Sequence, residues 1–206
     1  MKIGVMGGTF DPIHIGHLLL GEFAYSDFKL DEIWFLPNGD PPHKEVELTE
    51  EGLQHRIAMV ERAVAEVPYF RISFSEAKIN THSYTYKTMG EFRRLYPQDE
   101  FYFILGADAL FSIEKWKFFQ EIFPNCTILA AKRDDKEISE LNQQITYLTE
   151  KYNARIKLLR APFIEVSSTT IRERVAKGLP VRYMVPDTVA KYIEQYQLYR
   201  KDGQHV

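Results

Sequence analysis

Short apolar runs recur along the chain and alternate with longer amphipathic stretches. The runs are rich in β-branched and aromatic residues, which is typical of buried strands. In the stretches between them, apolar residues recur at spacings of three and four, as at Leu53, Ile57 and Val60, which predicts helices. Strands that alternate with helices favour an α/β fold with a doubly wound parallel sheet flanked by helices. The predicted strands cover residues 2–6, 32–36, 70–74, 101–105, 127–131 and 156–159.

Length and composition suit one globular domain. The chain has 206 residues, 45% of them hydrophobic and 27% charged, and no apolar run approaches the roughly 20 residues that cross a bilayer. We therefore expect a single domain over residues 1–206, with a small helical extension at about 168–200. A formal net charge of −3 predicts no nucleic-acid or membrane partner. A lone cysteine, Cys126, and the lack of a secretion-type leader favour a cytoplasmic location.

The segment GGTFDPIHIGH, residues 7–17, follows the first predicted strand. Ligands on parallel sheets lie outside the carboxyl ends of the strands, where Gly7 and Gly8 allow close backbone approach. His14 and His17 fall at the start of a predicted helix over 15–28, whose free N–H groups favour an anion. Two alternatives remain at this point: an ordinary turn with incidental histidines, and a zinc site, which two histidines alone do not complete.

This segment resembles the signature of the nucleotidyltransferase superfamily with the (H/T)xGH motif. The resemblance implies a Rossmann-like fold and transfer of a nucleotidyl group from ATP or CTP with release of pyrophosphate. A second motif, VSSTTIR at residues 166–172, follows the last predicted strand and resembles the superfamily's triphosphate clamp, ISSTxIR. Hydroxyls and N–H groups of Ser168 and Thr169 are expected to cap the next helix and meet phosphate oxygens, with Arg172 one turn on. Taken alone, the motif also fits a helix cap followed by an exposed arginine.

Three further features bear on the group that accepts the nucleotide. Ser83 is a candidate N-cap, which would leave the N–H groups of Thr85 and Tyr86 free to bind a carboxylate. Asp108 follows the fourth predicted strand and can accept hydrogen bonds from a sugar. Trp116 lies between two lysines, so that stacking on a pyridine ring and a core position are both open.

The order GADxL then tryptophan, together with the loop PPHK at residues 41–44, resembles the bacterial nicotinate-nucleotide adenylyltransferases. The resemblance implies the reaction of ATP with nicotinate mononucleotide to form deamido-NAD and pyrophosphate. It also implies Mg²⁺ carried by ATP, with no metal held by protein side chains. Nicotinamide mononucleotide or phosphopantetheine as acceptor, a non-catalytic nucleotide sensor and a ligand-free interaction module are the alternatives, and a homodimer stays open.

The acceptor phosphate is already an anion near neutral pH, so the reaction needs positioning and charge rather than a general base. We expect His17 to contact the α-phosphate, His14 and Arg172 to hold the outgoing phosphates, and Lys44 to add charge. Other residues are expected to bind substrates without a catalytic role. For ATP these are Gly7, Gly8, Thr9, Phe10, Gly106, Asp108, Arg133, Ser168 and Thr169, and for nicotinate mononucleotide they are Ser83, Thr85, Tyr86, Asp108 and Trp116.

Overall fold

Six strands lie at the positions that the sequence predicts, within one residue or two at their ends. The computed structural model describes residues 1–39, 49–78, 82–132, 138–162 and 164–200. The strand order is β3-β2-β1-β4-β5-β6, and it reverses between β1 and β4. The predicted Rossmann-like parallel sheet is thereby confirmed. The strands are β1 (Lys2–Gly8), β2 (Glu32–Pro37), β3 (Phe70–Ile72), β4 (Glu100–Gly106), β5 (Thr127–Ala131) and β6 (Ile156–Leu159).

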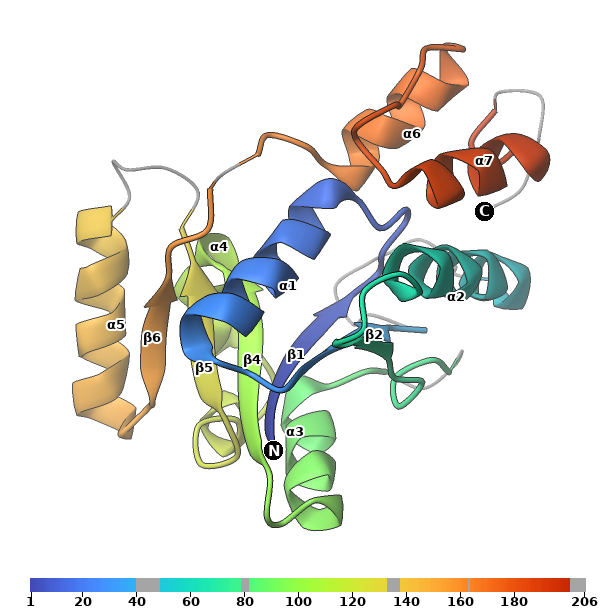
Figure 1. Cartoon of the computed structure of the whole chain (residues 1–206). Coiled ribbons are helices and arrows are strands. Elements are labelled where there is room, and N and C mark those ends of the chain that lie inside the picture. The colour runs from blue at the N-terminus through green and yellow to red at the C-terminus, as the bar shows by residue number, and fades with distance from the viewer. Residues whose placement is uncertain (40–48, 79–81, 133–137, 163, 201–206) are drawn as a thin grey trace. The chain divides into compact units, whose positions relative to one another are not determined.

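Helices connect these strands (Figure 1). The predicted helix over 15–28 is confirmed as α1, and two 3₁₀ turns, η1 (Ile113–Lys115) and η2 (Phe119–Glu121), follow α4. No helix in the described ranges is both long and apolar enough to cross a membrane. The helices are α1 (Ile15–Phe28), α2 (Glu50–Val64), α3 (Thr85–Leu95), α4 (Ala107–Phe111), α5 (Ile138–Tyr152), α6 (Ser168–Ala176) and α7 (Asp187–Gln195).

The chain divides into two units, each assembled from segments that are not consecutive. The expected single domain over 1–206 stays a prediction. The first unit comprises Met1–Met6, Leu19–Trp34 and Ser83–Phe163, and the second comprises Gly7–Leu18, Phe35–His82 and Ile164–Val206.

In the first unit, strands pair in parallel and in continuous register. Val5 lies opposite Phe103, Phe103 opposite Ile128, and Ile128 opposite Ile156. Ile128 is fully buried, and α5 packs beside β6 (Figure 1). The apolar run that begins at Cys126 predicts a buried cysteine, and this prediction is confirmed. Burial raises the pKa of its thiol to about 12.

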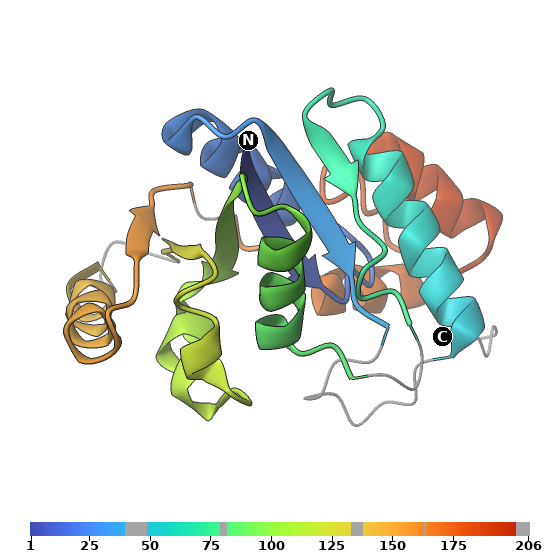
Figure 2. The ribbon, with the colours of Figure 1, turned by 90° about the horizontal axis from the view of Figure 1, so that it is seen from below.

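In the second unit, α2 and α7 pack side by side (Figure 2). Thr49 caps α2 by accepting a hydrogen bond from the Gly52 N–H at 3.0 Å. The Tyr192 hydroxyl lies 2.9 Å from Nδ1 of His55, and the Arg62 guanidinium lies 4.3 Å above the Tyr192 ring. His55 therefore has the structural role expected of a residue in an amphipathic helix.

The C-terminal helix docks on this unit through one apolar face. The sequence predicts that Val189, Ile193 and Tyr196 share the buried face. Val189 and Ile193 are buried, but Tyr196 is 48% exposed and Tyr192 takes the buried position instead. The prediction is wrong for Tyr196 because its ring packs over Tyr192, at 4.4 Å between centroids, at the edge of the contact.

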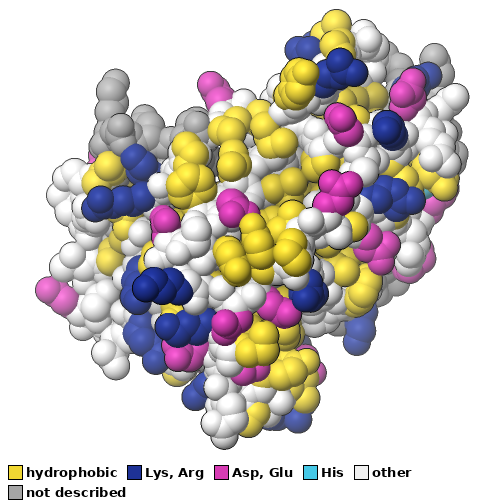
Figure 3. Space-filling view, in the orientation of Figure 1, with side chains coloured by type: hydrophobic (Ala, Val, Ile, Leu, Met, Phe, Trp, Pro, Cys, Tyr) yellow, Lys and Arg dark blue, Asp and Glu magenta, His cyan; other side chains and the backbone are white. Residues whose placement is uncertain are grey.

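Helix α1 has apolar residues on all sides. Only Gly21 and Ala24 are buried in it, while its leucines and Phe23 stay partly exposed. Figure 3 shows these hydrophobic side chains gathered at the surface over α1.

We predict that Gly4→Ala destabilises the first unit. A Cβ at Gly4 would lie 2.5 Å from Cδ1 of Ile33 and 3.0 Å from Cδ1 of Leu30, so the side chains must shift. Overpacking of this kind costs about 1–3 kcal/mol, measured as the free energy of unfolding in urea. Gly90→Ala in α3 is the control, since its nearest neighbour would be 3.9 Å away, and it should stabilise by about 0.5–1 kcal/mol. Equal stability of the Gly4 variant and the parent would contradict the packing argument.

Candidate active site

The turn after β1 is shaped by a buried aromatic ring. Phe10 adopts a left-handed backbone conformation, with φ of 50°, and its side chain is only 2% exposed. Its ring meets the ring of His17 edge-on at 5.0 Å. A Cβ on Gly8 would lie 2.9 Å from Cε1 of this ring, so Gly8 has to lack a side chain. Because the ring supports His17 from within the core, only the backbone of Phe10 is available to a ligand.

The two histidines of the motif form one unit. Their rings stack with 3.7 Å between centroids and 28° between planes. A Cβ on Gly16 would lie 3.1 Å from the His14 ring, which explains the glycine between them. The backbone N–H of His14 donates to Nδ1 of His17 at 3.3 Å. This nitrogen is therefore the acceptor, and the proton of neutral His17 lies on Nε2, which can donate to a ligand.

Both imidazoles are neutral at pH 7. Burial lowers the pKa of His14 from 6.5 to about 4. Burial, and to a lesser extent the neighbouring His14, lowers the pKa of His17 to about 3. The pair therefore supplies hydrogen-bond donors rather than positive charge, so an anionic ligand needs its counter-charge from another group.

The start of α6 is tied to the same turn. Ser167, and not Ser168, is the N-cap, because its Oγ accepts the N–H of Thr170 at 3.1 Å. The expected cap at Ser168 is wrong by one residue. Ser168 instead donates its hydroxyl proton to the carbonyl of Pro12 at 2.9 Å. The predicted triphosphate clamp at residues 166–172 therefore contacts the predicted nucleotide-binding segment at residues 7–17.

Asp11, in the turn after β1, contacts both the guanidinium of Arg172 and the hydroxyl of Tyr199. Nη1 of Arg172 donates to the backbone oxygen of Asp11 at 2.7 Å and lies 3.4 Å from its carboxylate. Nη2 of Arg172 lies 3.4 Å from Oγ1 of Thr169. The hydroxyl of Tyr199 donates to the carboxylate of Asp11 at 2.7 Å, and burial raises the pKa of that hydroxyl. The structure thus brings Arg172 to the motif turn, where one side of its guanidinium is held by Asp11.

Sequence reasoning missed three residues of this arrangement. Asp11 lies inside the motif at residues 7–17, so the sequence could have identified it. Tyr199 lies in no motif, so nothing in the local sequence indicates its role. Arg56 on α2 is fully buried and donates to the carbonyls of Thr9 at 2.8 Å and Asn38 at 2.6 Å. The signal in the sequence was its position, because Arg56 stands three residues after Leu53 and four before Val60 and so shares the apolar face of the helix, where an arginine is rare.

The predicted acceptor residues lie in the first unit. Tyr84 is the N-cap of α3, so the expected cap at Ser83 is wrong. Thr85 and Tyr86 are the first two residues of the helix, and N–H groups at these positions have no intrahelical acceptor. The Tyr86 ring meets the Phe118 ring edge-on at 5.0 Å. The N–H groups of Thr85 and Tyr86, which are predicted to bind a carboxylate, therefore lie in the first turn of α3.

The segment after β4 carries the other predicted acceptor residues. Asp108 is exposed in the first turn of α4, and a Cβ on Gly106 would meet no atom within 4 Å. Trp116 is half-buried and meets Phe103 edge-on at 6.3 Å, so it is neither a core residue nor a free surface ring. The hydroxyl of Tyr152 on α5 donates to Glu114, two residues before Trp116, at 2.5 Å.

Lys44 and Arg133 lie outside the described residues, as does the loop at 41–44. Their expected roles stay predictions. Within the described ranges, no three His, Cys, Asp or Glu side chains are grouped so that they could hold a metal ion.

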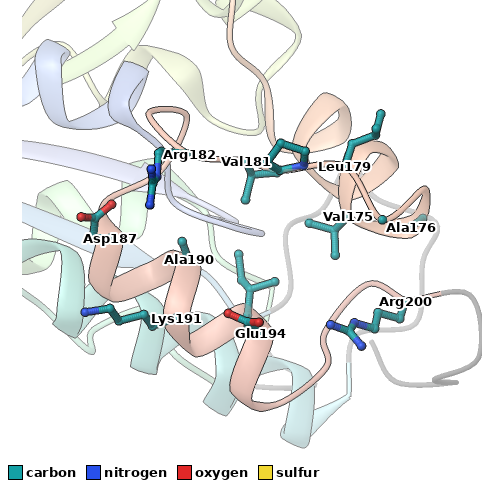
Figure 4. Close-up of a pocket in the computed structure, with 13 residues that line it drawn as sticks. Val175, Ala176, Leu179, Val181, Arg182, Asp187, Ala190, Lys191, Glu194 and Arg200 are labelled. Carbon is teal, nitrogen blue, oxygen red and sulfur yellow. The ribbon is translucent and has the colours of Figure 1, made fainter.

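A cavity of about 820 Å³ lies elsewhere in the second unit (Figure 4). Residues of α6 and the turn after it, including Val175 and Leu179, line one side, and α7 lines the other. Its charged side chains are of both signs, so they select no ligand class. None of the catalytic or substrate-binding residues predicted from the sequence is among those that line this cavity. The charged residues are Arg182, Asp187, Lys191, Glu194 and Arg200.

The chain is similar to known proteins over nearly its whole length. The cytidylyltransferase-like family model matches residues 5–174. A probable nicotinate-nucleotide adenylyltransferase of Lachnoclostridium phytofermentans is 45% identical over 199 residues, which cover 96% of this chain and 98% of the relative. A second, from Thermoanaerobacter sp., is 39% identical over 206 residues, 100% of this chain and 97% of the relative.

Solved structures show the same fold. Plasmodium falciparum nicotinic acid mononucleotide adenylyltransferase complexed with APC has a TM-score of 0.76 at 20% identity, with 96% of each chain covered. The same protein complexed with NaAD has a TM-score of 0.75 at 20% identity, with 96% of this chain and 97% of that chain covered. At this identity the likeness concerns the fold.

The histidine pair predicts a pH dependence of stability. In the unfolded chain the imidazoles take up protons near pH 6.5, but in the folded protein only near pH 4 and 3. The unfolded state therefore binds more protons between these values, and the free energy of unfolding should fall as pH decreases from 6.5 to 4. Each histidine contributes at most about 1.4 kcal/mol per pH unit. Urea titrations of the parent and of a His14→Asn, His17→Asn double variant measure the difference in slope, and equal slopes would refute the lowered pKa values.

Proposed function

Because the chain belongs to the nicotinate-nucleotide adenylyltransferase family, we propose that it transfers the adenylyl group of ATP to nicotinate mononucleotide. The products are deamido-NAD and pyrophosphate, and the reaction belongs to NAD biosynthesis. The observation that carries the proposal is the 45% identity over 96% of the chain, together with a motif turn whose two histidines are stacked against each other.

The chemistry is a direct displacement at phosphorus. An oxygen of the acceptor phosphate forms a bond to the α-phosphorus of ATP, and the bond from that phosphorus to the bridging oxygen breaks with its electron pair leaving on pyrophosphate. The acceptor oxygen is anionic near neutral pH, so no proton has to be removed. Catalysis then rests on alignment and on stabilising the negative charge of the transition state.

We assign the charge stabilisation to the second unit. Nε2–H of His17 is a neutral donor directed by the His14 N–H, and we place it at the α-phosphate. We assign Arg172 and the N-terminus of α6 to the outgoing phosphates, with Thr169 beside Arg172. In this assignment Arg172 supplies the positive charge that the neutral histidines lack.

Magnesium is part of the proposal only as a companion of ATP. As the family resemblance implies, we expect the nucleotide's own phosphates to carry the ion, where it would neutralise charge. The cytoplasmic location and the homodimer also stay predictions, and sedimentation equilibrium of the purified chain tests the latter.

We assign acceptor recognition to the first unit. The first N–H groups of α3, at Thr85 and Tyr86, suit a carboxylate because the helix terminus favours negative charge. The half-buried indole of Trp116 suits stacking on a pyridine ring, and Asp108 suits a ribose hydroxyl. A carboxylate gains more from a helix terminus than a neutral amide does, which favours nicotinate over nicotinamide.

The first test is release of pyrophosphate from Mg-ATP with each of three acceptors: nicotinate mononucleotide, nicotinamide mononucleotide and phosphopantetheine. Release should be fastest with nicotinate mononucleotide. His17→Ala should lower kcat by about 10²–10³, since it removes one donor to the transition state. His55→Ala is the matched control, because His55 contacts Glu51 on its own helix together with Tyr192 and Tyr196, none of which belongs to the site, and its kcat should stay near that of the parent. Near-parental turnover of the folded His17 variant would remove His17 from the mechanism.

A second test concerns the acceptor ring. Trp116→Ala should raise KM for nicotinate mononucleotide by about 5–150-fold through loss of stacking worth roughly 1–3 kcal/mol, and leave KM for ATP unchanged. Trp116→Phe keeps a ring and should recover most of the loss. An equal rise in both KM values would point to a structural role for the indole.

A further inference from the structure

Arg56 is a fully buried cation outside every motif that the sequence singled out. It lies on α2 among buried apolar residues, with Leu53 1% exposed and Val60 0% exposed. Burial lowers the pKa of its guanidinium, and the nearby carboxylate of Asp11 opposes that shift. An arginine stays charged under such conditions, so the fold holds a positive charge in its interior.

Packing alone does not account for this arginine. Its Nη1 donates to two carbonyls, whereas its Nε and Nη2 are buried with no hydrogen-bond partner among the described residues. A buried polar group without a partner costs about 1–3 kcal/mol. The other buried unpartnered side-chain atoms in the described ranges are Nδ1 of His14 and Oδ1 of Asn38. All of them belong to residues in or bonded to the turn after β1, and unsatisfied groups that are rare and gathered at one turn call for an explanation.

Arg56 fixes the direction of one amide group directly, through the Thr9 carbonyl, and of a second one through Asn38, whose carbonyl it also holds. In a trans peptide the C=O and the next N–H point in opposite directions. The Gly8 carbonyl accepts the N–H of Asn38 at 3.0 Å, so the Thr9 N–H points away from Asn38. The Thr9 carbonyl accepts Arg56 at 2.8 Å, so the Phe10 N–H points away from Arg56. The only cis peptide among the described residues is Asp11–Pro12, so both of these are trans.

We propose that Arg56 is a positioning residue of the nucleotide site: it turns the Phe10 amide toward the phosphates of ATP by holding the Thr9 carbonyl, and the Thr9 amide by holding Asn38, whose N–H binds the Gly8 carbonyl. The proposal rests on the proposed function in taking ATP as the ligand. Arg56 itself touches no substrate in this account. It acts through the backbone of the turn, and the left-handed Phe10 is the residue whose amide depends on it most directly.

The test compares Arg56→Met with Arg62→Met on the same helix. Methionine keeps much of the apolar stem of arginine and removes the charge and the donors. Arg62 contacts the Tyr192 ring and the Ala58 carbonyl, and neither belongs to the site, so its variant controls for loss of an arginine from α2. Isothermal titration with Mg-ATP alone should show at least about tenfold weaker binding for Arg56→Met and parental binding for Arg62→Met, both corrected for the folded fraction. Parental affinity of folded Arg56→Met would overturn the proposal.

A second variant keeps the proposal testable if methionine prevents folding. Arg56→Lys retains the charge but not the planar fork that spans two carbonyls. In ¹⁵N spectra, addition of Mg-ATP should shift the amide of Phe10 in the parent, and this shift should be reduced in Arg56→Lys together with the affinity. A parental Phe10 shift and parental affinity in Arg56→Lys would overturn the positioning role.

These readouts are independent of the acceptor. If the parent binds Mg-ATP but releases no pyrophosphate with any acceptor, the proposed function fails while the role of Arg56 is still tested by binding. If KM for nicotinate mononucleotide changes in Arg56→Met as much as the affinity for Mg-ATP does, the effect is a general structural one and the positioning role is refuted.

Discussion

The position of the C-terminal segments against the turn after β1, within the second unit, depends on the carboxylate and the carbonyl of Asp11. Arg172 from α6 and Tyr199 from the C-terminal segment both donate to this one residue. The contacts join parts of the chain more than 150 residues apart in sequence, |i−j| of 161 and 188, to the turn that follows β1. A hydrogen bond to a charged group contributes about 1.5–3 kcal/mol, so the turn and α6 are held in one arrangement.

A second set of contacts fixes the same turn from the other side. Asn38 and Arg56 bind the carbonyls of Gly8 and Thr9, and the buried ring of Phe10 packs against His17. Every backbone carbonyl from Gly8 to Pro12 except that of Phe10 thereby has a partner that an observed contact identifies. The carbonyls of Gly8 and Thr9 are both occupied, so the amides that follow them are oriented before a ligand arrives. This is the form of preorganisation that phosphoryl and nucleotidyl transfer needs.

The sequence predicts the framework because periodicity and turn chemistry are local. All six strands, the helix over 15–28 and the buried Cys126 follow from apolar patterns of a few residues. The caps fail by one residue at Ser83 and Ser168, since each lies in a run of neighbouring residues with hydroxyl groups and only tertiary packing decides which one takes the extended conformation. Tyr196 fails for the same kind of reason, because helical spacing alone does not tell the edge of a buried face from its centre.

The contacts of Arg56 and Tyr199 with the turn after β1 could not be predicted from the sequence, and neither could the electrostatics of the site, which depend on burial and on tertiary contacts. The histidines are neutral because they are buried, and they are buried because the turn is packed against core rings. A neutral donor loses little solvation when a ligand covers it, but it brings no charge to an anion. Arg172 supplies that positive charge. Asp11 contacts Nη1 of its guanidinium and so fixes the orientation of the group, while Nη2 lies on the side of Thr169. The site therefore combines two neutral histidines with one cation, Arg172, and the position of Asp11 in the turn determines where that cation lies.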